Sequence, residues 1–175
     1  MISQSILKLA QAFLCPLVTF CYLEASLIAT EPALSPYVIE RQKDPVEWHA
    51  WSEETRLALQ ASGKPGLFSV SHELNSLSIA MGEQSFRNTE IARQINEGFF
   101  PVVVDKNEHP QLAEFLALYV RNTKQVSGWP LTVVVTPELE PIDGGGYYPP
   151  TDDWGSQGIS SVLKVVHEQW GKNKR

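Results

Sequence analysis

The chain has 175 residues, of which 43% are hydrophobic and 19% charged, a composition typical of a globular protein with room for one core. Acidic residues outnumber basic ones by 20 to 14, so the formal net charge is −6. Nucleic-acid binding needs a concentrated basic surface, and the scattered lysines and arginines of this chain argue against it. The basic C-terminal residues Lys172, Lys174 and Arg175 are interpreted as a solvated tail.

The first 29 residues form an apolar segment with features of an export signal. Leu9 to Leu23 has the length of a signal-peptide core, Lys8 precedes it, and Ala29 offers a small residue at a cleavage point. A spanning helix needs roughly 20 apolar residues, so an uncleaved membrane anchor is the second interpretation and a structured extension the third. The sequence predicts an exported (periplasmic or extracellular) or membrane-anchored protein. It leaves a cytoplasmic location open.

Both cysteines, Cys15 and Cys21, lie in this N-terminal segment. The domain predicted over residues 30–175 therefore contains no thiol, and it can form no internal disulfide, thiolate metal site or cysteine nucleophile. Its histidines are isolated, and the acidic residues around Asp152 lack the ligand spacing of a calcium loop. We accordingly predict no metal and no cofactor.

Helix caps and apolar periodicity predict an alternation of helices and strands. In chain order they give a helix ending near Ser62, a strand over 66–71, helices beginning near Asn75 and near Asn88, a strand over 100–104, a helix from Pro110 with the stripe Leu112, Phe115, Leu116 and Tyr119, a strand over 131–135, a short strand before Gly144, and a helix over 157–170. Glycines 144–146 are interpreted as a bend or bulge near a sheet edge. A βαβ unit followed by a ββα unit is the layout of a thioredoxin-like sheet, but periodicity alone supports only an α/β fold with a mixed sheet.

Several short motifs occur in the order typical of one protein family. They are Ser35-Pro36-Tyr37, Asp44-Pro45-Val46-Glu47-Trp48, Gly63-Lys64-Pro65, Gly128-Trp129-Pro130-Leu131, Thr136-Pro137, and the run from Gly144 to Pro150. By these motifs the chain resembles the thioredoxin-like domain of the spermatogenesis-associated protein family, from about Ser35 to Trp170. The resemblance implies an α/β fold with a mixed central sheet flanked by helices. Longer members carry a helical domain after this region, and no carbohydrate-related activity is carried over from it.

The resemblance also implies a degenerate active site after the strand over 66–71. The family's Cys-x-x-Cys cysteines fall on Asn75 and Ser78, with Ser76 and Leu77 between them. Neither an amide nor a hydroxyl can form a disulfide, so we predict that the chain is not a thiol oxidoreductase. The sequence leaves open whether it has any other enzymatic activity.

Three interpretations of the loop over 72–78 follow. In the structural one, Asn75 is a helix N-cap and the serines are solvated. In the second, the loop survives as a surface for a protein or peptide, next to a proline that the resemblance implies to be cis. The residues of this predicted site are Asn75, Ser76, Leu77, Ser78, Trp129 and Pro130. In the third, His72 acts with Ser76 or Ser78 as a hydrolase, but no orienting group is visible.

The sequence therefore favours a non-catalytic thioredoxin-like module that binds a protein or peptide partner. Any membrane contact is expected only through the N-terminal segment if it is uncleaved. The alternative is an accessory component of a redox system whose cysteines belong to another chain. A remnant without selected activity is the third possibility.

Overall fold

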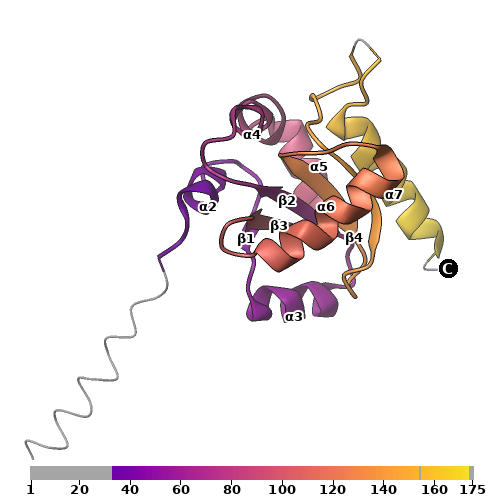
Figure 1. The fold of residues 1–175 in the computed structure, drawn as a ribbon. Coiled ribbons are helices and arrows are strands. Elements are labelled where there is room, and N and C mark those ends of the chain that lie inside the picture. The colour runs from indigo at the N-terminus through magenta and orange to yellow at the C-terminus, as the bar shows by residue number, and fades with distance from the viewer. Residues whose placement is uncertain (1–32, 154, 174–175) are drawn as a thin grey trace, which may run out of the picture. The chain divides into compact units, whose positions relative to one another are not determined.

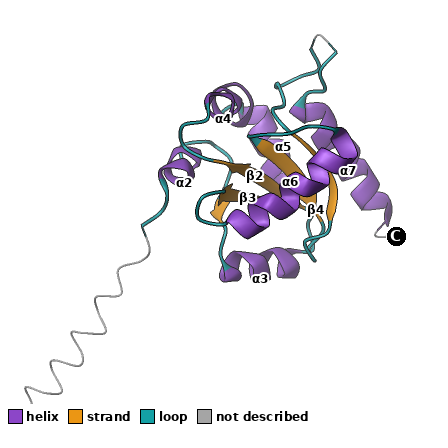
Figure 2. Cartoon of the chain, viewed as in Figure 1, coloured by secondary structure: helices purple, strands orange, loops and turns teal. Residues whose placement is uncertain are grey.

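The computed structural model describes residues 33–153 and 155–173 (Figures 1 and 2). The predicted export signal, the boundary after residue 29 and both cysteines lie outside these residues. Among the described helices, none combines the length and apolar character needed to cross a membrane.

The described elements include all those predicted from periodicity. They are α2 (Pro36–Arg41), β1 (His49–Ala50), α3 (Glu53–Ser62), β2 (Gly66–Ser71), α4 (Ser76–Met81), a π-helical turn η1 (Gly82–Phe86), α5 (Thr89–Gly98), β3 (Phe100–Asp105), α6 (Pro110–Lys124), β4 (Leu131–Val135), β5 (Pro141–Gly145) and α7 (Ile159–Asn173). The caps of α3 are as expected, because the Ser52 hydroxyl accepts from the Thr55 N–H and Gly63 has a left-handed φ of 60°.

The five strands form one mixed sheet in the order β1-β3-β2-β4-β5. Strands β1, β3 and β2 are parallel, with Gly66 opposite Phe100 and Ser71 opposite Asp105. Strand β4 runs antiparallel to β2, with Val70 opposite Leu131. This arrangement confirms the predicted mixed central sheet.

Helices cover both faces of the sheet and enclose a separate apolar cluster on each (Figure 1). Leu67 and Val103 point into the cluster that contains side chains of α2, η1, α5 and α7. Phe68, which follows Leu67, and Val102, which precedes Val103, point into the other cluster, which contains side chains of α3 and α6. This alternation follows from the two-residue period of a strand. Because both faces are covered, β2 is buried at every position and β3 at all but its first.

Three elements were not predicted, namely α2, β1 and η1. Strand β1 has two residues, which is too short for a periodic signal, and a π-helical turn has no simple sequence pattern. The predicted stripe of α6 is also partly wrong, because Phe115 is 49% exposed. The helix instead buries Ala113, Leu116 and Val120.

The glycine run has a different role from the one expected. The irregularity in the β4–β5 pairing falls between Val134 and Val135, opposite the start of β5 and outside the glycines. Gly145 lies in the edge strand β5, where an added Cβ would overlap the Tyr148 hydroxyl. The missing side chain therefore allows Tyr148 to pack against the sheet.

The buried Tyr148 should make the fold sensitive to alkali. Burial raises the pKa of Tyr148 to about 12, and Asp143 adds to the effect. An unfolded tyrosine ionises near pH 10, so the unfolded chain loses this proton first as the pH rises. We expect the loss of this one proton to lower the free energy of unfolding by about 2 kcal/mol between pH 10 and pH 12. Urea titrations at several pH values measure this fall.

The control separates Tyr148 from the other ionisable groups. Tyr148→Phe should flatten the alkaline fall, whereas Tyr147→Phe, which removes the neighbouring hydroxyl that donates to Gln84, serves as the reference. A fall of equal steepness in wild type and Tyr148→Phe would contradict the assignment.

Candidate functional site

The predicted site residues meet at one end of the sheet. The parallel strands β2 and β3 end at Ser71 and Asp105, and the antiparallel strand β4 begins there at Leu131. The segments that follow β2 and β3 and precede β4 therefore lie at the same edge. Ligand sites of α/β proteins usually occupy this edge, where the parallel strands end.

Asn75 joins two of these segments. Its side-chain oxygen accepts a hydrogen bond from the Ser78 N–H at 2.8 Å, which makes it the N-cap of α4. Its side-chain amide donates to the Trp129 carbonyl oxygen at 3.1 Å. Asn75 thus caps a helix and ties that helix to the segment before β4. The first function was predicted from the sequence, and the second depends on the fold.

Ser78 lies beneath the site rather than on its surface. It is 4% exposed and belongs to the polar surroundings of Tyr37, whose hydroxyl lies 2.9 Å from the Ser69 hydroxyl. Burial raises the pKa of Tyr37, and the Ser69 and Ser78 hydroxyls act in the opposite direction. Of the predicted site residues, Ser78 is therefore a supporting group that a partner cannot reach directly.

Leu77 is presented to solvent, and two further apolar side chains accompany it. The exposed fractions are 52% for Leu77, 82% for Leu74 and 44% for Ile79. Leu74 and Ile79 occupy the positions of a hydrophobic staple around the N-cap Asn75, yet Leu74 is too exposed to contribute much packing. Leu74 was missed by the sequence prediction, although an apolar residue in the polar loop HELNS was its visible signal.

Trp129 and Pro130 form the opposite side of the site. The peptide bond between them is cis, as the family resemblance implied. The Lys106 ammonium lies 5.7 Å from the centre of the Trp129 ring, a cation–π contact that the sequence analysis missed. In the described part of the chain, the Trp129 backbone N–H donates to no acceptor, while its carbonyl accepts from Asn75.

A buried arginine lies in the core close to Tyr37, the residue whose hydroxyl Ser69 and Ser78 surround. The side chain of Arg41 is 2% exposed, and its guanidinium lies about 6 Å from the ring centres of Tyr37 (6.0 Å) and Phe86 (5.8 Å). Its Nη1 atom lies 3.4 Å from Asp44 Oδ2, which also accepts a hydrogen bond from the Trp48 indole at 3.2 Å. Burial raises the pKa of Asp44, although Arg41 opposes this effect. The missing side chain of Gly82 provides the space for the guanidinium.

The site offers hydrogen-bonding and apolar groups but no catalytic arrangement of the kinds considered. No hydrogen bond among the described residues joins His72 to Ser76 or Ser78, as a serine–histidine pair would require. Residues 33–153 and 155–173 also contain no group of three histidine, cysteine or acidic side chains placed to hold a metal ion.

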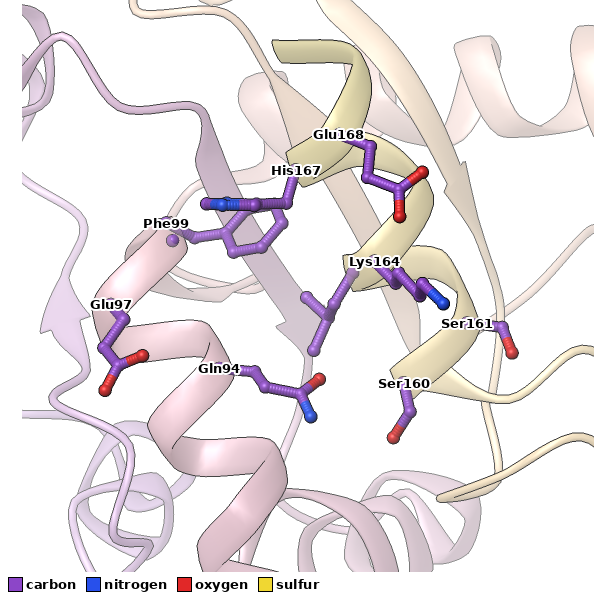
Figure 3. A pocket seen from close by; sticks show the side chains of 10 residues that line it. Gln94, Glu97, Phe99, Ser160, Ser161, Lys164, His167 and Glu168 are labelled. Carbon is purple, nitrogen blue, oxygen red and sulfur yellow. The ribbon is translucent and has the colours of Figure 1, made fainter. Parts of the chain in front are cut away.

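A cavity of about 470 Å³ lies between α5 and α7, away from the predicted site (Figure 3). Figure 3 shows the His167 ring next to Phe99, with Gln94 and Ser160 on opposite helices. None of the six predicted site residues lines this cavity.

Comparison with known proteins identifies the family. The model Thioredox_DsbH, described as a protein of unknown function (DUF255), matches residues 28–175. The chain belongs to this thioredoxin-like family. Spermatogenesis-associated protein 20 of Homo sapiens is 36% identical over 140 residues, and uncharacterized protein B0495.5 of Caenorhabditis elegans is 32% identical over 138 residues. The resemblance seen in the sequence is thereby confirmed.

The family's fold is confirmed by a solved structure. A thioredoxin from Thermus thermophilus, 17% identical, matches with a TM-score of 0.53 over 75% of this chain and 94% of that chain. The alignments with the two curated relatives cover 80% and 79% of this chain, but only 18% and 19% of the relatives' length. This family member is thus a thioredoxin-like module matching less than a fifth of those longer proteins.

Proposed function

We propose that this protein is a non-catalytic thioredoxin-like module that binds an extended segment of a protein or peptide partner. The binding surface consists of Asn75, Ser76, Leu77, Trp129 and Pro130, with Leu74 added and Ser78 beneath it. The partner would be met outside the cytoplasm, since the apolar segment over 9–23 favours export. The intact mass of the protein recovered from cell fractions tests the export step.

One observation carries the proposal: Asn75 ties the Trp129 backbone to the segment that presents the exposed apolar side chains Leu74 and Leu77. The Trp129 N–H has no acceptor in the described residues, and its carbonyl is held in place by Asn75. An extended peptide can satisfy such a donor by pairing alongside it, as in the addition of a strand. Leu74 and Leu77 supply apolar area, whose burial contributes about 25 cal/mol per Å².

Photo-crosslinking tests the surface directly. A photo-reactive residue at position 77 of the full chain should capture a partner in cells, and mass spectrometry should identify the adduct. Trp129→Ala should reduce the adduct at least tenfold, because it removes the opposite wall of the surface. In a separate pull-down with the captured partner, Leu77→Asp should reduce binding to a similar extent, because burial of an unpaired carboxylate is unfavourable.

The control is an apolar residue of similar exposure on another helix. Val165 of α7 is 44% exposed, compared with 52% for Leu77, so Val165→Asp introduces the same charge on a different face. Circular dichroism establishes that each variant is folded. Partner binding that persists in folded Leu77→Asp and Trp129→Ala would disprove the proposed surface.

A further inference from the structure

We propose that a small pocket beside Trp129 selects the partner, by accepting an aromatic side chain that is followed or preceded by an acidic residue. The pocket lies between α6 and the segment before β4, and its apolar wall consists of Ala117, Val126, Trp129 and Leu131. This inference rests on the proposed function, because Trp129 belongs to both the pocket and the binding surface.

The size of the pocket suits one ring. Its volume is about 150 Å³, similar to that of an engineered apolar cavity in another protein that binds benzene. Unlike that cavity, this pocket is partly open and also has the polar side chains of Glu114, Arg121 and Ser127 in its lining. Aromatic rings also pack favourably against a tryptophan, with a gain of about 0.5–1.5 kcal/mol beyond their area burial. A single aromatic side chain therefore fills the space and contacts the Trp129 wall.

The position of the pocket suits an extended peptide. A strand that pairs with the Trp129 N–H places its side chains on alternating sides at about 3.3 Å per residue. Trp129 itself lines the pocket, so a side chain close to the paired residue can reach it.

The charges around Trp129 favour an acidic neighbour in the peptide. Arg121 and Glu114 both line the pocket, and neither forms an ion pair in the described residues. Lys106 adds a second cation over the Trp129 ring. Arg121 and Lys106 thus place two cations near Trp129, and Glu114 is the carboxylate among the residues that line the pocket. Arginine can bind a carboxylate through two parallel hydrogen bonds, so Arg121 is the residue assigned to the acid.

Selection from a phage-displayed library of random nonamer peptides tests the inference with the full chain. Adjacent aromatic–acidic pairs should be enriched more than tenfold over the input library. Arg121→Glu should shift the preference to aromatic–basic pairs, and Ala117→Leu, which fills the pocket, should remove the aromatic preference. Lys172→Glu changes the net charge equally at the far end of α7 and should leave the enriched sequences unchanged.

The selection experiment distinguishes failure of the pocket preference from failure of the proposed peptide-binding function. Peptides that depend on Trp129 but show no aromatic–acidic preference, or keep it in Arg121→Glu, would overturn the pocket and leave the proposed function standing. If the wild type enriches no peptides other than those that the folded Trp129→Ala variant also enriches, both the pocket and the peptide-binding function are wrong.

Discussion

Gly82→Ala should destabilise the protein by about 3 kcal/mol or more, although it adds a single methyl group. An added Cβ at Gly82 would overlap the Arg41 guanidinium. A flexible side chain on a surface could move aside, but Arg41 is 2% exposed, ion-paired with Asp44 and packed near Tyr37 and Phe86. Displacement of the guanidinium breaks a buried ion pair, which costs about 3–5 kcal/mol. Urea unfolding monitored by circular dichroism measures the loss.

A double-mutant cycle identifies the cause of this loss. In an Arg41→Met background the guanidinium is gone, so Gly82→Ala should cost at least about 2 kcal/mol less than in wild type. The control is Gly171→Ala in α7, where an added Cβ has no neighbour within 4 Å. That change should be neutral or stabilising by up to about 1 kcal/mol, because alanine has the higher helix propensity. Equal costs of Gly82→Ala in both backgrounds would contradict the overlap with Arg41.

Asn75→Cys combined with Ser78→Cys should create thiol–disulfide exchange activity in a protein predicted to have none. The two positions are the N-cap and third residue of α4, and side chains three apart on a helix are neighbours about 5–6 Å apart. A thiol at a helix N-terminus has a lowered pKa and is therefore a better nucleophile near neutral pH. We expect the double variant to accelerate the reduction of insulin disulfides by dithiothreitol at least tenfold over wild type.

The native thiols must be removed for this test, so the double variant and the reference protein both carry Cys15→Ser and Cys21→Ser. Each single cysteine variant should remain inactive, because a catalytic cycle needs both thiols. Loss of the Asn75 cap and of its bond to Trp129 should cost about 1–3 kcal/mol, which urea unfolding can measure. A folded double variant that forms the disulfide without any rate increase would show that the scaffold has lost more than its cysteines.

Much of the fold follows from local sequence. Ser52 and Gly63 bound α3 because capping depends on nearest neighbours, and β2 and β3 are recognisable because strands covered on both faces must be apolar. The absence of any cysteine after Cys21 is also a property of the sequence alone. These features required no knowledge of distant contacts.

The remaining features depend on residues that are far apart in the chain. The bond from Asn75 to Trp129 joins residues 54 positions apart. Lys106 reaches the Trp129 ring because β3 ends at the edge of the sheet where β4 begins, with β2 between the two strands. The Arg41 guanidinium fills space left by Gly82, so an arginine that would ordinarily be expected at the surface lies in the core. Local sequence specified the caps and strands because their hydrogen bonds and side-chain periodicity are short-range. Tertiary structure alone decided which side chains meet at the site, because packing brings together groups that share no sequence pattern.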